Sequence, residues 1–139
     1  MATVTAGITL TSAAGDLITD ALSLSDTTTI TITDMVTSGL ARAKLTSTVK
    51  GTASGQATLY TANEFDATSN SVYLYIKNTA TTRGHTITVY ASDDDTTEVL
   101  KLFGGDIALL PITDALTFKA YTSNSGTIVE SMVFGTDHA

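Results

Sequence analysis

Apolar and polar residues alternate along most of this chain, and a two-residue period sustained over so many segments favours β-structure almost throughout. The clearest example is VYLYIKN at 72–78, in which Val72, Leu74 and Ile76 fall on one side and the residues between them on the other. Side chains of a strand point alternately to the two faces of its sheet, whereas a helix repeats every 3.6 residues. Threonine, which is β-branched and favours strands, recurs in the same segments, as in TTTITITD.

The alternating segments are short and are separated by polar or glycine-containing breaks. We therefore expect roughly eight to eleven strands at intervals of about 8–12 residues, arranged as an antiparallel β-sandwich. A jelly-roll topology is preferred to an immunoglobulin-like one, because the chain has no tryptophan and no cysteine pair. We expect a single domain over 1–139, with 1–16 as an extended N-terminal arm. Little or no helix is predicted, and TANEFD at 61–66 is a helical turn or a loop.

Composition and charge exclude several classes of function. The net charge is −7 and the seven basic residues are scattered singly, so no clustered basic face is available for nucleic acid. The absence of cysteine excludes disulfides, thiolate nucleophiles and zinc–cysteine sites, and favours assembly in a reducing cytoplasm. The start, MATVTAGITL, does not have the pattern of a signal peptide, and no apolar run approaches the roughly 18 residues of a membrane span. We expect neither nucleic acid nor membrane as a partner.

The acidic cluster in ASDDDTTEV is the strongest candidate for chemistry. Asp93, Asp94, Asp95 and Glu98 offer oxygen ligands to a hard cation such as calcium. However, the spacing does not match a calcium-binding loop, and strand-like segments flank the cluster. Aspartates also accept turn conformations readily, and so the preferred interpretation is a hairpin loop with hydrated charges. No metal or cofactor is expected, while cation binding by this loop stays an open alternative.

No other motif predicts catalysis. Gly104-Gly105-Asp106 matches neither phosphate-binding glycine pattern, and is interpreted as a tight turn in which both glycines adopt positive φ. The two histidines, His85 and His138, are too few for a metal cluster. No nucleophile motif is present. We therefore expect a protein without catalytic residues, that is, not an enzyme.

Tyrosines provide the remaining candidate functional residues. Tyr73, Tyr75 and Lys77 share one face of the strand predicted at 72–78, and Tyr121 lies on another predicted strand. Amphipathic rings are enriched at protein–protein contacts. Two interpretations stay open for these four residues: they bind a partner, or they pack against neighbouring strands on the outside of a sheet.

Three segments of the second half resemble a known class of proteins. VYLYIKNT, LKLFGGDIALLP and FKAYTSNSGTIVESMVFGTD are similar to segments of the small all-β proteins that decorate or cement the heads of tailed bacteriophages; the similarity covers 71–137. The resemblance implies a virion protein on the outer capsid surface that stabilises the head, forms a homotrimer, binds the major capsid protein and assembles in the host cytoplasm. On this hypothesis the N-terminal arm adds a strand to a neighbour's sheet edge.

The alternative function is a receptor- or glycan-binding module of a phage tail fibre or a surface adhesin. Such a module is also β-rich and without a catalytic set, but it presents a polar groove or an aromatic patch and is joined to a shaft. We expect this chain to stand on its own, which favours the decoration hypothesis.

Overall fold

The computed structural model describes residues 2–13, 22–32, 35–51, 54–65, 72–91 and 97–136. The aspartates at 93–95, His138 and the predicted end of the arm at residue 16 lie outside these ranges. The described residues contain eleven strands and no helix, and hence no helix that would cross a membrane. Residues 62–65 form turns and bends, with Asn63 at φ 62°. The strand number and the near absence of helix are as predicted.

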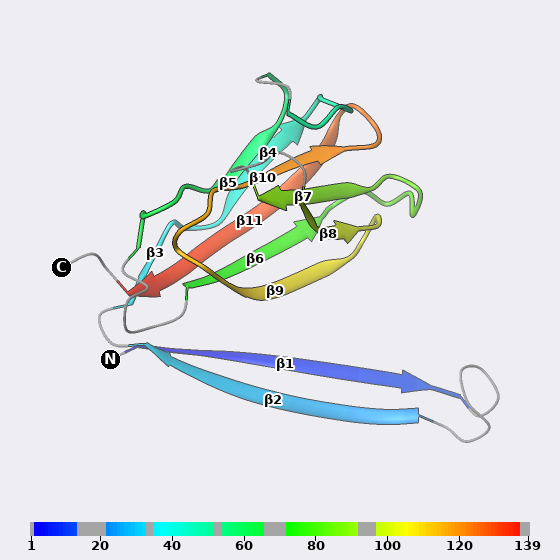
Figure 1. The fold of residues 1–139 in the computed structure, drawn as a ribbon. Helices are drawn as coiled ribbons and strands as arrows, with labels where there is room; N and C mark the ends of the chain where they lie inside the picture. Colours follow the sequence, from blue (N-terminus) through cyan, green and yellow to red (C-terminus); the bar gives the residue numbers. More distant parts are fainter. Residues whose placement is uncertain are drawn as a thin grey trace. The chain divides into compact units, whose positions relative to one another are not determined.

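The chain divides into two compact units, Met1–Asp34 and Met35–Ala139. The first unit is a ribbon of two antiparallel strands, β1 (Ala2–Ser12) and β2 (Leu22–Ile32). Ala2 lies opposite Ile32 and Ser12 opposite Leu22, so β1 is paired along its whole length (Figure 1). The segment predicted as an arm at 1–16 thus includes one strand of a ribbon rather than a free strand.

The second unit contains the other nine strands. In chain order they are β3 (Met35–Thr37), β4 (Ala41–Leu45), β5 (Ala57–Tyr60), β6 (Val72–Asn78), β7 (Ile87–Ala91), β8 (Glu98–Leu102), β9 (Ile107–Ile112), β10 (Phe118–Thr122) and β11 (Thr127–Thr136).

Strand pairing in this second unit is nested. Early strands pair with late ones, all antiparallel: β4 with β11, β5 with β10, β6 with β9 and β7 with β8. This is the pattern of one long hairpin folded over on itself, so that β11 also pairs with β6 and β10 with β7. The result is two sheets, β5–β10–β7–β8 and β3/β4–β11–β6–β9, in which β3 and β4 share one edge of β11 (Figure 1). Two sheets connected in this way form a jelly roll, which confirms the predicted fold.

The core lies between the two sheets; β6 and β10 contribute alternate residues to it, while all five residues of β7 are buried. Val72, Leu74 and Ile76 of β6 have no exposed surface, which confirms the inward face predicted for them. Val129 and Val133 of β11 belong to the same buried cluster. Burying each such side chain stabilises the fold by roughly 1.5–3 kcal/mol, and these residues therefore hold the two sheets together.

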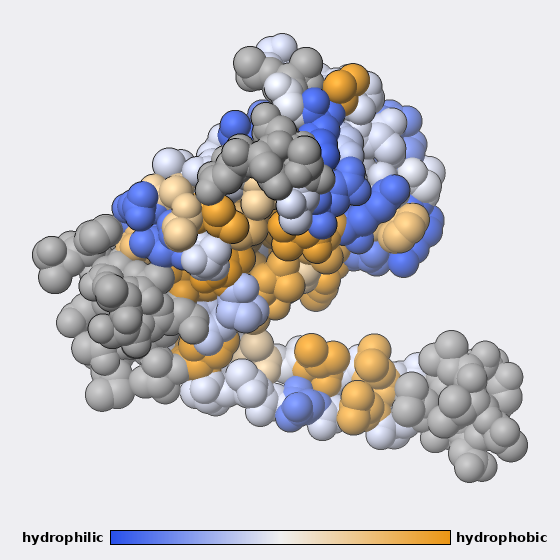
Figure 2. All heavy atoms as spheres, viewed as in Figure 1, coloured by the Kyte–Doolittle hydropathy of each residue, from blue (hydrophilic) through white to orange (hydrophobic). Residues whose placement is uncertain are grey.

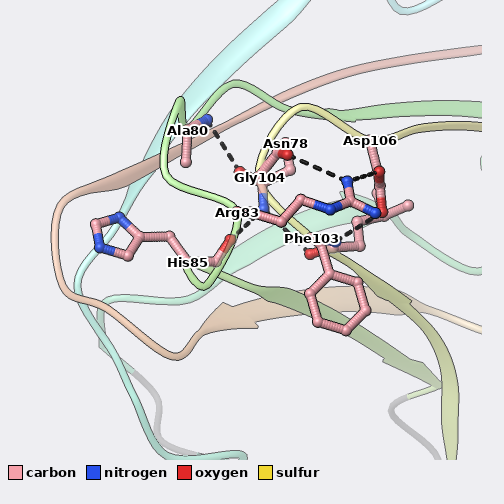
Figure 3. Close-up of polar contacts among 8 residues, drawn as sticks. Asn78, Ala80, Arg83, His85, Phe103, Gly104 and Asp106 are labelled. Atoms are coloured by element: carbon pink, nitrogen blue, oxygen red, sulfur yellow. Dashed lines mark hydrogen bonds and ion pairs between the residues drawn. The ribbon is translucent and has the colours of Figure 1, made fainter.

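Buried Asn78, at the end of β6, connects the two sheets through hydrogen bonds. Its side-chain amide donates to the carbonyl oxygens of His85 (2.7 Å) and Leu102 (3.1 Å), and its Oδ1 accepts from the N–H of Ala80 (3.1 Å) (Figure 3). Leu102 ends β8 and His85 precedes β7, so both acceptors belong to the opposite sheet or its connections. Leaving a buried polar group without a hydrogen bond lowers the free energy of unfolding by about 1–3 kcal/mol. Asn78 provides partners for three such groups, the carbonyls of His85 and Leu102 and the N–H of Ala80.

The Gly104–Gly105 turn is not the hairpin turn that the sequence suggested. It connects β8 to β9, which lie in different sheets. Only Gly105 has a positive φ, of 88°. Gly104 is required for a different reason, because a Cβ at that position would collide with the carbonyl oxygen of Thr82. An ion pair between Arg83 and Asp106 closes the same turn (Figure 3). The Arg83 guanidinium also lies 5.2 Å from the centre of the Phe103 ring.

Replacing Asn78 by alanine should lower the free energy of unfolding by about 2–4 kcal/mol, because the carbonyls of His85 and Leu102 lose their donor in a buried site. Urea denaturation followed by circular dichroism measures the change. The matched control is Asn124→Ala, at an exposed asparagine in the loop before β11, which we expect to change stability by less than about 0.5 kcal/mol. Equal effects of the two variants would contradict the role given to Asn78.

Candidate functional site

Tyr73, Tyr75 and Lys77 of β6 all point away from the core, on the outside of the β3/β4–β11–β6–β9 sheet. Directly opposite residues of antiparallel strands share a face, and the register therefore gives their neighbours. Three rows cross the sheet from β11 through β6 to β9: Glu130, Lys77 and Ile107; Met132, Tyr75 and Leu109; Phe134, Tyr73 and Pro111. We call this surface the Tyr75 face; it consists of these nine residues together with Ile128 of β11 and with Arg42 and Lys44 of β4.

Tyr121 does not belong to this surface. It lies on β10 in the other sheet, where its hydroxyl donates to Oε1 of Glu98 (2.7 Å) and its ring meets the edge of Tyr90 at 6.0 Å. Partial burial, followed by the hydrogen bond to Glu98, raises the pKa of Tyr121 above its ordinary value. Of the four candidate partner-binding residues, three therefore come together and Tyr121 is separated from them by the core.

Glu130 holds the polar centre of the Tyr75 face in place. Its Oε2 accepts from the guanidinium of Arg42 at 2.8 Å, and its Oε1 accepts from the Tyr75 hydroxyl at 3.3 Å. The hydrogen bond from Arg42 holds the pKa of Glu130 below its ordinary value of 4.5. Burial and the charge of Glu130 raise the pKa of Tyr75. The carboxylate is thus ionised and fixes both the Arg42 head group and the Tyr75 ring.

The Tyr75 face is locally basic although the protein is acidic. Three of the seven basic residues lie on it, namely Arg42, Lys44 and Lys77. Glu130 is its one carboxylate, whereas the whole chain has a net charge of −7. Arg42, Lys77 and Glu130 also border a hollow of about 520 Å³ that extends to the Gly104–Gly105 turn. A surface of this kind attracts an anionic group and is unfavourable for a second cationic one.

Apolar side chains surround this basic centre. Ile107 is 65% exposed and Ile128 is 40% exposed. The rings of Tyr73 and Phe134 stack at 5.4 Å with an interplanar angle of 12°. Tyr75, Leu109 and Met132 are partly buried between these groups. A mixture of aromatic, methionine and arginine side chains is typical of protein–protein interfaces.

The ribbon of the first unit has two chemically different faces, a feature that sequence reasoning did not identify. One face carries only threonine, serine and Gly7 among its described side chains, including the cross-strand pair Thr9 and Ser25. The other, the apolar face, carries Ile8, Leu10 and Leu24, which are 63%, 50% and 50% exposed. Figure 2 shows apolar residues on the surface of the ribbon. The alternation in TVTAGITLT indicated β1 and that in TTTITITD indicated part of β2, but only the pairing register joins Leu10 to Leu24 across the ribbon.

Other candidate residues give no catalytic or metal-binding arrangement in the part of the chain that the structure describes. No group of three or more His, Asp or Glu side chains able to hold a metal occurs there. The strands that flank the acidic cluster, β7 and β8, pair as antiparallel neighbours, and the N–H of Ala91 donates to the carbonyl oxygen of Thr97. His85 borders a second hollow of about 350 Å³, whose other lining residues are 79–82 and 124–128.

Comparisons with known proteins give little further information. No family model and no curated protein matches the chain. A solved structure of Bacillus endospore appendages, described as a family of disulfide-linked pili, is similar at 18% sequence identity, over 75% of this chain and 89% of that chain, with a TM-score of 0.45. This likeness is too weak to extend the description of that protein to this one. The comparisons identify no phage decoration family, and what is established is a small all-β sandwich.

Replacing Glu130 by glutamine should lower the melting temperature at pH 7, and the deficit should shrink in acid. Because the pKa of Glu130 is lower in the fold than its ordinary value of 4.5, its ionisation stabilises the fold above about pH 4.5, and this contribution is lost as the pH falls through the folded-state pKa. Thermal unfolding between about pH 3 and pH 8 measures the effect. Glu64→Gln, at an exposed position outside the Tyr75 face, is the control; a Glu130→Gln deficit that is the same at both ends of the range would refute the assignment.

Proposed function

We propose that this protein is a non-enzymatic structural subunit of a tailed-phage virion, which binds the outer surface of the head and stabilises it by contacting the major capsid protein. The observation that carries the proposal is the exposed apolar face of the β1–β2 ribbon, because it indicates a subunit that assembles with further protein chains. The motifs at 72–79, 100–111 and 118–137, which are similar to those of capsid decoration proteins, direct it toward the phage head.

The ribbon supports an assembling role because a two-stranded ribbon is marginally stable at best by itself in water. Ile8, Leu10 and Leu24 expose half or more of their surface. Covering apolar surface of this kind lowers the free energy by roughly 25 cal/mol for each Å² that is removed from water. A partner that covers the ribbon therefore stabilises both the ribbon and the complex.

The jelly-roll unit suits the same role. It is held together by the buried residues between its sheets and by polar contacts such as those of Asn78, without any cysteine. A protein of this kind folds in the host cytoplasm before it joins the virion. Modest contacts that are repeated over a lattice add up through multivalency, and a homotrimer on the capsid surface would offer three such sets of contacts to neighbouring capsid subunits.

The proposal predicts that the purified protein binds empty, expanded heads of the tailed phage that encodes it. In co-sedimentation, the protein should pellet with the heads and saturate at a fixed number of copies per head, and the decorated heads should disrupt at a higher temperature than bare ones. Heads of an unrelated phage are the control. Failure to pellet with the cognate heads, or equal pelleting with both kinds, would rule out the decoration role.

One observation favours the second candidate, a glycan-binding module. The hollow of about 350 Å³ is lined mainly by hydroxyl and amide groups, including Thr79, Thr82, Asn124 and Thr127. Groups of this kind can bond to sugar hydroxyls, and the volume is within the range of small-ligand sites.

On this second candidate, the protein should bind a defined set of sugars on a glycan array. Asn124→Ala should abolish that binding while leaving the fold intact, and Thr58→Ala, at an exposed position on the strand β5, should not affect it. The absence of any array signal, or the same signal from both variants, would exclude the hollow as a sugar site.

A further inference from the structure

Two exposed surfaces in the described part of the chain, the apolar face of the ribbon and the Tyr75 face, differ in charge. On the ribbon's apolar face, Asp26 lies directly opposite Ile8 and is the only charged residue among the described residues of the ribbon, 2–13 and 22–32. The apolar face is therefore hydrophobic with one negative charge near the middle of its length. The surface that covers it should be apolar and should carry a positive charge at the corresponding position.

A second ribbon is a poor partner for this face. Asp26 is the seventh of the eleven cross-strand pairs counted from Ala2, close to the centre. Two ribbons stacked face to face about a two-fold axis would bring both carboxylates close together in an apolar layer. Like charges that are desolvated together are strongly unfavourable.

The Tyr75 face meets both requirements. It presents Ile107, Leu109 and Tyr75 as an apolar surface, and Lys77 lies directly opposite Ile107 in the same row. Glu130 is already bonded to Arg42, which leaves the face positive overall through Lys77 and Lys44. On a protein of net charge −7, a positive apolar surface is also the one that another acidic copy can approach most easily.

We infer that the apolar face of the ribbon of one copy packs on the Tyr75 face of a second copy of this chain, with Asp26 beside Lys77. The ribbon then forms a third layer on the outside of the sandwich, in the manner of one sheet packed on another. The inference rests on the proposed function only in requiring that the chain assembles, and it does not depend on the capsid.

The available area is sufficient for a stable contact. The seven residues of β6 extend over about 24 Å, and a two-stranded ribbon covers a band about 10 Å wide, which gives roughly 240 Å² on each surface. Each contact buries about 500 Å² in total, and in a closed ring such as the proposed homotrimer each copy takes part in two contacts, which together bury about 1,000 Å², the smallest area expected of a specific interface. The ribbon strands, at eleven residues each, are longer than β6 and span it fully.

The first experiment measures the mass of the full chain in solution by analytical ultracentrifugation, without capsids. We expect the wild type to be an oligomer at micromolar concentration and Leu10→Lys/Leu24→Lys to dissociate at least about 30-fold more readily. The matched control, Thr9→Lys/Ser25→Lys, places the same two charges on the neighbouring cross-strand pair but on the other face of the ribbon, and should remain an oligomer. A monomeric wild type, or equal masses for the two variants, would overturn the inference.

The second experiment identifies the contacting surface. The chain has no cysteine, so Ile8→Cys/Ile107→Cys introduces the only two thiols, both at exposed positions that flank the proposed pair of Asp26 and Lys77. A short bis-maleimide should link chains to one another, as seen on a denaturing gel and by intact mass. Thr9→Cys/Ile107→Cys, with the first thiol on the threonine face, should give little crosslinking.

Other occupants would give different products. A link within one chain would show that the ribbon packs on its own sandwich, and crosslinked dimers from Ile8→Cys alone would show that two ribbons stack; either result rejects the inference.

Reversing the charges adds a check of the register: Asp26→Lys and Lys77→Asp should each weaken the oligomer about tenfold or more, and the double variant should recover most of the loss. Additive losses would refute the pairing of Asp26 with Lys77. Because no capsid is present, these outcomes are independent of head binding.

Discussion

The pairing of β11 with β6 is the contact on which the rest of this structure depends. Without it, the nested pairs would form one long open hairpin with a single apolar face exposed to water. When β11 lies beside β6, that hairpin folds into two sheets, and the face that carries Val72, Leu74 and Val129 becomes a closed core. The same pairing places Glu130 beside Lys77 and Met132 beside Tyr75 on the outside. One set of backbone hydrogen bonds thus creates both the core and the surface on which the proposed assembly depends.

The apolar surface that remains after folding is unevenly distributed. In the sandwich, inward residues are covered by the opposite sheet, and Asn78 supplies donors to carbonyls where the sheets meet. In the ribbon, no second layer is available from its own two strands, and Ile8, Leu10 and Leu24 stay exposed. The free-energy cost of exposing apolar surface to water grows with its area. The ribbon is therefore the part of the molecule whose stability depends most on a partner.

Sequence reasoning succeeded where the determining physics is local. The inward side of 72–78 and the outward position of Tyr73, Tyr75 and Lys77 follow from the two-residue period of a strand, and both agree with the structure. The reasoning failed where distant segments meet. Arg42 and Glu130 are 88 residues apart in the chain, and no local pattern predicts their ion pair. Tyr121 was grouped with Tyr73 and Tyr75 by residue type, but belongs to the opposite sheet. Gly104 was assigned a positive φ, whereas the nearby carbonyl of Thr82 is what excludes a side chain there.

What the amino-acid order determined by itself was which residues face inward and which face outward along each strand, because neighbouring side chains of an extended chain must point in opposite directions. The absence of cysteine and the excess of acidic over basic residues also followed from the sequence without any structure, but the gathering of Arg42, Lys44 and Lys77 on one face did not. Only the tertiary structure decided which strands are neighbours, and hence that the jelly roll gathers Arg42, Lys77, Tyr75 and Glu130 on one face and that β1 and β2 form a ribbon of their own. Which strands pair, and in which register, depends on the entropy of closing long loops and on the burial of whole sheet faces. Both contributions to the free energy belong to the complete fold and not to any single segment.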